Sequence, residues 1–250
     1  MKCYFENVEI NYEVLKTGEI DAPLVFLHGW GGSTKSFEFF AKEMSKYRTC
    51  ILIDFPPFGK SGNLKGPWDI DKYTNCVLQV LKDIGAKKCD IVAHSFGGRV
   101  AIQMAGKYNI CGRLLLTGCA GINQKSLKTK CKIGAYKFKK ILCKCGVLSK
   151  SKLLGAGSEE YKNLSPIMKQ TFRNVVNYDE RYLLKSIYCP TLLVWGKDDT
   201  ATPFRWTKIF KKHIKDCEVI SLTGDHFAYL QNASIFLKIM QSFLANVQNY

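Results

Sequence analysis

Ile91-Val92-Ala93-His94-Ser95-Phe96-Gly97-Gly98 is the stretch that decides the fold, because an apolar run leads directly into a serine framed by small residues. A serine hydroxyl becomes an effective nucleophile when it lies on a sharp turn, beside a base and beside donors that can bind an oxyanion. The pattern G-x-S-x-G builds such a turn between a strand and a helix. Ala93 and Gly97 occupy its two small positions, so Ser95 is the candidate nucleophile. The alternative is a serine in an ordinary strand-to-helix turn.

The length and composition are those of a globular protein. A chain of 250 residues with 46% hydrophobic and 23% charged residues can form one domain that carries an insertion. Glu6 and Glu9 interrupt the apolar character of the N-terminal residues, so we expect no signal peptide. We also find no apolar run long enough to span a bilayer. These features predict a cytoplasmic protein without a transmembrane segment.

The eleven cysteines are odd in number and irregular in spacing, which argues against a disulfide framework. Cys50, Cys89 and Cys217 lie in or beside apolar runs, where cysteine acts as a small buried hydrophobic residue. Cys131, Cys143 and Cys145 lie closer together, but no fourth ligand for a structural zinc is near them in the sequence. We therefore expect reduced thiols, and neither a metal nor an organic cofactor is implied.

The net charge of +16 is unevenly placed along the chain. Residues 123–158 contain ten lysines and no acidic residue. Such a segment can bind nucleic acid or an anionic membrane, or it can be a solvated lysine-rich face. Arginine forks, which nucleic-acid readers use, are few in this chain, so we favour the solvated face and expect no nucleic-acid partner. An anionic substrate or surface stays open.

Short apolar runs alternate with amphipathic segments along most of the chain, which predicts an α/β fold. The alternation indicates a doubly wound, mostly parallel sheet with right-handed crossovers. An additional alternating segment, Val8–Leu15, resembles an edge strand. The other predicted strands are Leu24–Leu27, Cys50–Ile53, Cys89–Ala93, Arg113–Leu116, Thr191–Trp195 and Cys217–Leu222. The predicted helices are Phe37–Tyr47, Tyr73–Ile84, Gly97–Tyr108, Phe204–Ile214 and Ser234–Val247.

One long segment, residues 122–187, breaks this alternation. It is helical in tendency and too long for a plain connection between neighbouring strands. We interpret it as a helical cap inserted into a core made of residues 1–121 and 188–250. The cap would lie over the carboxyl edge of the sheet, where ligands bind in open α/β folds.

A serine nucleophile needs a base, and the chain contains only four histidines. His28 ends a predicted strand, His94 adjoins Ser95 and should point away from it, and His213 lies in a predicted surface helix. His226 follows the last predicted strand and alone has the freedom and the position to reach Ser95. The alternative is a loop histidine bonded to the backbone.

The acid that orients the base is predicted in the segment after the strand Thr191–Trp195. A carboxylate there can bond the far nitrogen of the histidine and fix its tautomer. We favour Asp199 over Asp198. Asp225 adjoins His226 and is poorly placed to approach its ring.

Two backbone N–H groups are candidates for an oxyanion hole. The N–H of Phe96 lies at the start of the helix that follows Ser95, where the helix dipole assists anion binding. The N–H of Trp30 lies in a glycine-rich loop after a strand, although the loop could also be a simple flexible turn.

With these residues in place, the chain resembles the α/β-hydrolase superfamily, in particular its small, capped esterases and lipase-like hydrolases. The order Ser95, Asp199, His226 is the order of that superfamily. Pro57 stands where the family turn D-x-P-G-x-G-x-S has glycine, which stiffens the turn. The segments that carry the resemblance are His28–Gly32, Asp54–Ser61, Ala93–Gly98, Gly196–Pro203 and Gly224–His226.

The resemblance implies a serine hydrolase that cleaves a small-molecule carboxylic ester or thioester through an acyl-enzyme. Epoxide hydrolases and haloalkane dehalogenases of this fold use an aspartate nucleophile, so Ser95 argues against both. Carbon–carbon hydrolases usually carry Asn where His94 stands, which disfavours them; a non-catalytic ligand-binding protein on this scaffold is the other alternative. The loop at Trp30 is also similar to that of carboxylesterases that act on an acyl carrier protein, so a carrier-bound acyl substrate stays open, as does the oligomeric state.

Overall fold

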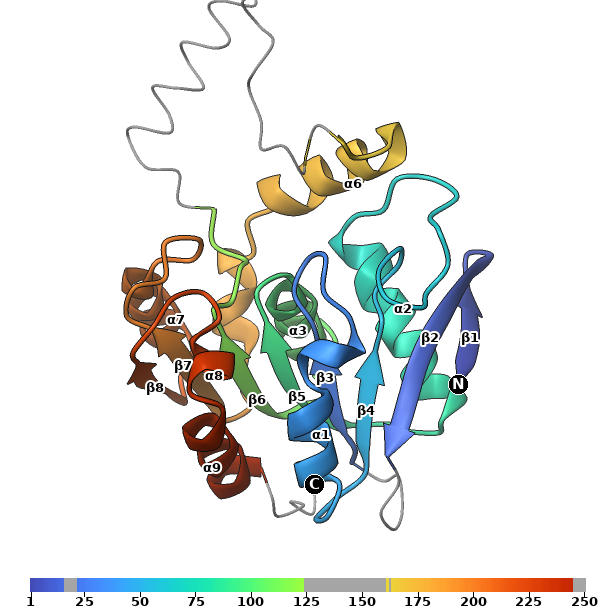
Figure 1. Cartoon of the computed structure of the whole chain (residues 1–250). Coiled ribbons are helices and arrows are strands. Elements are labelled where there is room, and N and C mark those ends of the chain that lie inside the picture. Colours follow the sequence, from blue (N-terminus) through green and yellow to red (C-terminus); the bar gives the residue numbers. More distant parts are fainter. Residues whose placement is uncertain (16–21, 124–160, 162, 245–250) are drawn as a thin grey trace, which may run out of the picture.

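A computed structural model describes residues 1–15, 22–123, 161 and 163–244, and its centre is one eight-stranded sheet. The strand order is β1-β2-β4-β3-β5-β6-β7-β8 (Figure 1). The six strands β4, β3, β5, β6, β7 and β8 run parallel to one another, whereas β1 and β2 are antiparallel to their neighbours. The predicted doubly wound, mostly parallel sheet is confirmed. Its strands are β1 (Lys2–Phe5), β2 (Val8–Leu15), β3 (Leu24–Leu27), β4 (Cys50–Ile53), β5 (Cys89–His94), β6 (Cys111–Thr117), β7 (Thr191–Gly196) and β8 (Cys217–Leu222).

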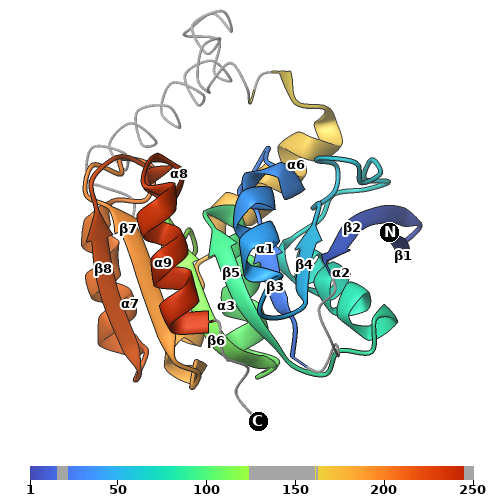
Figure 2. The same ribbon diagram turned by 60° about the horizontal axis from the view of Figure 1, so that its bottom comes forward.

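Helices cover both faces of the sheet (Figure 2). Helices α1 (Glu38–Met44), α8 (Ala228–Gln231) and α9 (Ala233–Leu244) lie on one face, and α2 (Ile70–Asp83), α3 (Phe96–Gly106) and α7 (Thr207–His213) lie on the other. None of these helices, nor any other in the described ranges, is long and apolar enough to cross a membrane.

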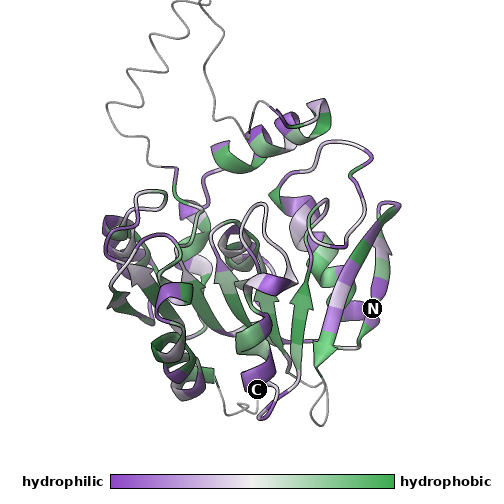
Figure 3. Ribbon diagram, viewed as in Figure 1, coloured by the Kyte–Doolittle hydropathy of each residue, from purple (hydrophilic) through white to green (hydrophobic). Residues whose placement is uncertain are grey.

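The alternation of side chains along each strand divides the core into two clusters. In β3, Leu24 and Phe26 pack with α1, α8 and α9, whereas Val25 and Leu27 pack with α2 and α3. All four residues of β3 are buried, because a strand inside a parallel sheet is covered on both faces. The strands at the centre of the molecule are accordingly hydrophobic over their length (Figure 3).

The N-terminal edge of the sheet differs from the sequence prediction. The segment Val8–Leu15 is a strand as predicted, but β1 pairs with it, so β2 is the second strand of the sheet and not its edge. The hairpin turns at Glu6 and Asn7, which both have positive φ (49° and 60°). Strand β1 has only four residues, too few for its pattern to be recognised in advance.

The described part of the predicted cap consists of α6 (Pro166–Asn177) and a 3₁₀ helix, η3 (Arg181–Ser186). Helix α6 begins with Ser165, whose hydroxyl accepts a hydrogen bond from the N–H of Met168, and Pro166 follows at the first helical position. Figure 1 shows α6 above the carboxyl ends of the strands. The ten lysines and the Cys131, Cys143 and Cys145 group lie outside the described residues, and the cap boundaries 122–187 stay a prediction.

Candidate active site

Ser95 lies between β5 and α3 on a strained turn, with φ of 50° and ψ of −110°. Non-glycine residues rarely adopt positive φ, and such strain is found at functional sites. The two glycines that follow are required by crowding. A Cβ on Gly97 would lie 2.2 Å from the Leu27 carbonyl oxygen, and one on Gly98 would lie 2.2 Å from the Cys119 sulfur. The small residues of the pattern therefore let this turn pack against β3 and the end of β6.

The structure brings Ser95, His226 and Asp199 together from three distant segments. The Nε2 atom of His226 is 2.9 Å from Ser95 Oγ, and its Nδ1 atom is 2.9 Å from Asp199 Oδ2. Because an ionised carboxylate only accepts hydrogen bonds, Nδ1 carries the proton, and Nε2 is left to accept the proton of the serine hydroxyl. In known Ser-His-Asp triads, the nucleophile, the general base and the orienting acid have the same order of contacts.

Asp199 is buried and accepts hydrogen bonds from several groups of its own loop. Ala201 and Thr202 donate their N–H groups to Oδ1 at 2.9 and 2.8 Å, and the Thr202 hydroxyl donates to Oδ2 at 2.7 Å. Burial alone would raise the pKa of Asp199, but the hydrogen bonds from His226 and Thr202 outweigh it and hold that pKa below its ordinary value. Asp198, the alternative acid, is exposed.

Two further residues shape the contact between the imidazole and the carboxylate, and the sequence analysis missed both. Thr202 Oγ1 lies 3.2 Å from His226 Nδ1 as well as bonding Asp199. Gly118 has a φ of 49°, and a Cβ there would lie 3.0 Å from His226 Nδ1. The Asp-x-x-Thr spacing after a strand is a recognisable signal for Thr202, whereas the role of Gly118 depends on where β6 ends in space.

A cavity of about 260 Å³ adjoins Ser95. Its rim includes two exposed apolar side chains, Phe227 and Leu230. The N–H of Phe96 is at the first position of α3 and therefore has no partner within the helix. The residues that line the cavity are Gly29, Trp30, Gly31, Gly32, Ser36, His94, Ser95, His226, Phe227, Tyr229 and Leu230.

The indole of Trp30 links the glycine-rich loop to helix α6. Its ring centroid lies 5.4 Å from that of Phe96, 5.0 Å from that of Phe58 and 5.3 Å from that of Phe172 on α6. All three ring pairs have edge-to-face geometry, which aromatic pairs favour. The loop that carries one candidate oxyanion donor is thus packed directly against the residue that carries the other.

The loop also bonds the turn at Asp54. His28 donates from Nδ1 to the Gly29 carbonyl and accepts at Nε2 from the N–H of Phe55. Burial lowers the pKa of His28 to about 4, so the ring is neutral. The turn forms although Pro57 replaces the family glycine: Asp54 accepts from Thr34 and Lys60 N–H groups at 2.6 and 2.9 Å. His28 is therefore a structural residue here.

The remaining candidates from the sequence are accounted for by packing. His213 is in α7 and bonds the Ile209 carbonyl through Nδ1 at 2.8 Å. Cys50, Cys89 and Cys217 are buried as predicted, and burial raises the pKa of the Cys50 and Cys217 thiols to about 12. No group of three or more His, Cys, Asp and Glu side chains within the described ranges is placed to hold a metal ion.

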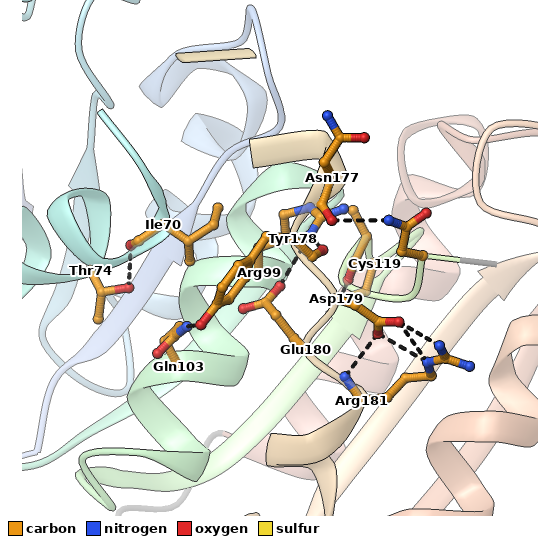
Figure 4. A network of polar contacts seen from close by, with 12 residues as sticks. Ile70, Thr74, Arg99, Gln103, Cys119, Asn177, Tyr178, Asp179, Glu180 and Arg181 are labelled. Carbon is orange, nitrogen blue, oxygen red and sulfur yellow. Dashed lines mark hydrogen bonds and ion pairs between the residues drawn. The ribbon is translucent and has the colours of Figure 1, made fainter. Parts of the chain in front are cut away.

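The segment that returns from α6 to the core is fastened by a polar network (Figure 4). Arg99 on α3 donates to the Tyr178 carbonyl at 2.7 Å and lies 3.4 Å from the Glu180 carboxylate. The N–H of Glu180 donates to the Gly121 carbonyl, and Asn123 donates to the Asn177 carbonyl. Figure 4 shows Arg99 beside Tyr178 and Glu180, with dashed lines marking the polar contacts. The network joins residues 121–123 to residues 177–180.

Three comparisons with known proteins agree with this architecture. A family profile described as alpha/beta hydrolase fold matches residues 22–124, which extend from β3 beyond β6 and include Ser95. The dihydrolipoyllysine-residue acetyltransferase component of the acetoin cleaving system of Pseudomonas putida is 33% identical over 89 residues, 36% of this chain. That alignment covers 24% of the relative, so the chain spans about a quarter of its length.

Two other matches extend over nearly the whole chain. The 2-hydroxy-6-oxononadienedioate/2-hydroxy-6-oxononatrienedioate hydrolase of a Pseudomonas species is 23% identical over 266 residues, covering 95% of this chain and 93% of the relative. The crystal structure of MGS-M2, an alpha/beta hydrolase enzyme from a Medee basin deep-sea metagenome library, superposes with a TM-score of 0.77 at 18% identity. It covers 100% of this chain and 99% of that one. The profile match assigns residues 22–124 to the alpha/beta hydrolase fold, and the described chain as a whole has that fold.

Proposed function

We propose that this protein is a serine hydrolase that cleaves a carboxylic ester or thioester through an acyl-enzyme. The observation that carries the proposal is the pair of 2.9 Å contacts that connect Ser95 Oγ, the His226 imidazole and the Asp199 carboxylate in series. The cavity beside Ser95, with the Phe96 N–H at a helix start, supports it further. A small capped hydrolase with its cap at residues 122–187 is the form we infer.

The mechanism follows from the direction of these hydrogen bonds. Ser95 Oγ attacks the acyl carbon while its proton passes to His226 Nε2. The carbonyl oxygen becomes an oxyanion, which the Phe96 and Trp30 N–H groups stabilise, and Asp199 stabilises the imidazolium.

Collapse of this intermediate breaks the bond to the leaving alcohol or thiol, which takes the proton from His226. Water then attacks the acyl-enzyme and gives its proton to His226. The second tetrahedral intermediate collapses to the free acid, and Ser95 recovers its proton from the imidazole. The cavity of about 260 Å³ beside Ser95 is where we place the acyl group or the leaving group, next to the loop that carries Trp30.

The test is the variant Ser95→Ala. Turnover of a short-chain nitrophenyl ester should fall about 10⁴-fold or more without loss of folding, because the nucleophile is removed and its surroundings stay. Ser45→Ala, at the end of α1, is the matched control and should keep full activity. Covalent labelling by a fluorophosphonate probe should likewise be lost with Ser95→Ala and kept with Ser45→Ala. Hydrolysis that persists in Ser95→Ala would contradict the proposal.

A second candidate is carbon–carbon bond hydrolysis, because the Pseudomonas dienedioate hydrolase matches this chain from end to end. The same Ser95 and His226 would serve in that reaction. A panel that contains nitrophenyl esters, acyl thioesters and 2-hydroxy-6-oxononadienedioate separates the two candidates by kcat/KM.

A further inference from the structure

The side chain that precedes the nucleophile contacts the residue that serves as base. His94 is the last residue of β5, and only 3% of its surface is exposed. Its ring centroid lies 4.7 Å from that of His226 and 4.9 Å from that of Tyr229. The sequence pattern indicated only that this side chain points away from Ser95.

The contact includes a hydrogen bond to the backbone of the base. His94 Nε2 lies 3.0 Å from the His226 carbonyl oxygen. A carbonyl oxygen only accepts, so Nε2 carries the proton and the ring is the Nε2–H tautomer. Burial and, less strongly, the nearby His226 lower the pKa of His94 to about 3, so the ring is neutral near pH 7 and the donor is kept.

Glycines enclose this connection on two sides. A Cβ on Gly29 would lie 2.8 Å from His94 Nδ1, so the loop backbone closes over the ring. A Cβ on Gly196 would lie 2.1 Å from the Asp225 carbonyl oxygen, so the loop that carries His226 packs directly on the end of β7. The ring therefore has a fixed place from which to hold the His226 carbonyl.

We propose that His94 is a positioning residue that holds the His226 backbone so that the imidazole Nε2 stays in contact with Ser95 Oγ. His94 and Ser95 are neighbours in the chain, and the acceptor is the carbonyl of His226 itself. This hydrogen bond thus connects the turn after β5, which carries Ser95, to the loop after β8, which carries His226. This inference rests on the proposed serine hydrolase function.

Two pairs of variants separate this role from simple filling of space. His94→Gln keeps an N–H donor at about the reach of Nε2, whereas His94→Met keeps the volume and loses the donor. His94→Asn is one methylene shorter than His94→Gln and does not reach the carbonyl; it provides a second comparison if His94→Met does not fold. His213→Met is the matched control, because His213 also donates to a backbone carbonyl but lies in α7.

We expect kcat of His94→Met and His94→Asn to fall by roughly ten- to a hundredfold, with KM changed less than about twofold, because a small displacement of the base slows the chemical step. His94→Gln should stay within about threefold of wild type in kcat, and His213→Met should equal wild type. Fluorophosphonate labelling rates should follow the same order, measured on samples with matched thermal unfolding.

Equal kcat in folded His94→Gln and His94→Asn, with Ser95→Ala inactive, would overturn the positioning role and leave the hydrolase proposal standing. A change in KM with kcat unchanged would also overturn the positioning role, because it would indicate an effect on substrate binding. Activity retained by Ser95→Ala would overturn the hydrolase proposal, and the positioning role with it.

Discussion

At the scale of single residues, the candidate site depends on which of two adjacent carboxylates meets the imidazole. Asp199 is buried and accepts from His226, Thr202 and Ala201, whereas Asp198 is exposed to solvent. The difference arises from the loop after β7, where the Asp198 N–H donates to the Gly224 carbonyl and so leaves the next side chain facing His226. A shift of one position along the chain thus decides which carboxylate contacts the imidazole.

Asp199→Asn should lower kcat on the order of 10⁴-fold, because an amide can present an N–H to His226 Nδ1 and so stabilise the wrong tautomer of the ring. Asp198→Asn is the matched control and should change kcat by less than about threefold. Steady-state kinetics on one ester substrate decide between them. If Asp198→Asn is the damaging change, the assignment of the acid is wrong.

The residues of the site differ in how far a sequence alone can identify them. Ser95, Asp199 and His226 follow strands whose carboxyl ends share one edge of the sheet, so strand prediction was enough to nominate them. Thr202, Gly118 and the contact of His94 with His226 depend on distances between loops of different strands. Such distances follow from the packing of the whole sheet, and no local pattern encodes them.

At the scale of elements, local patterns predicted the type of most segments and the exact bounds of four strands, but not the ends of the helices. Strand β8 has the predicted bounds, whereas the predicted helix Phe204–Ile214 begins as a 3₁₀ helix, η4 (Phe204–Trp206), before α7. Helix α2 begins at Ile70, three residues before the predicted start, because Asp69 caps it by accepting from the Lys72 N–H. The ends of helices depend on such single hydrogen bonds, which cannot be predicted from hydrophobic periodicity.

Helix α6 is held to the core in part by polar contacts that hydropathy could not reveal. Thr171 Oγ1 accepts from the Trp68 N–H at 3.0 Å, and Asn174 donates to the Trp68 carbonyl at 3.1 Å. After α6, the chain passes Glu180, which is fully buried and whose Oε1 atom has no hydrogen-bond partner among the residues that the structure describes. The end of this element therefore contains a polar group whose burial is only partly compensated.

Burial raises the pKa of Glu180 well above its ordinary value, and Arg99 offsets this only in part. Between the unfolded pKa near 4.5 and the raised folded value, the folded protein holds more protons than the unfolded chain. Stability contributed by this group is therefore lost as pH rises through that window. Glu180→Gln should become more stable than wild type from about pH 5 upward, with little difference below it, measured by thermal unfolding at several pH values.

Asp179→Asn is the control for the Glu180 prediction, because hydrogen bonds from Arg181 hold the pKa of Asp179 below its ordinary value although burial opposes them. Its contribution has the opposite sign, since it is present above the unfolded pKa and is lost as pH falls. A Glu180→Gln difference that is constant across the pH range would contradict a protonated Glu180.

At the scale of the whole molecule, the fold joins parts of the chain that are far apart in sequence. The two core clusters on either face of the sheet each include residues from both halves of the chain. At the end of the sheet opposite α6, Arg48 and Arg113 both donate to Asp90 Oδ2, which is fully buried. The same two arginines donate to the carbonyls of Leu244 and Phe243 at the end of α9.

This cluster could not be predicted from composition, although its effect on the fold is large. One buried carboxylate accepts hydrogen bonds from two guanidinium groups and neutralises one of their two charges, and both arginines also donate to backbone carbonyls of α9. The arrangement ties β5, β6 and the C-terminal helix to one another. Its members are separated by as many as 196 residues in the sequence.

Asp90→Ala should lower the free energy of unfolding by about 3–5 kcal/mol, because it leaves two buried guanidinium groups without their counter-charge. Asp71→Ala is the matched control: Asp71 pairs with Lys107 at 2.6 Å, but both side chains are more than 40% exposed. An exposed pair contributes about 1 kcal/mol or less, so this control should unfold near the wild-type midpoint in urea. Equal midpoints for the two variants would show that the buried cluster does not hold the C-terminal helix to the sheet, and the distant contacts would then have to act through the apolar core alone.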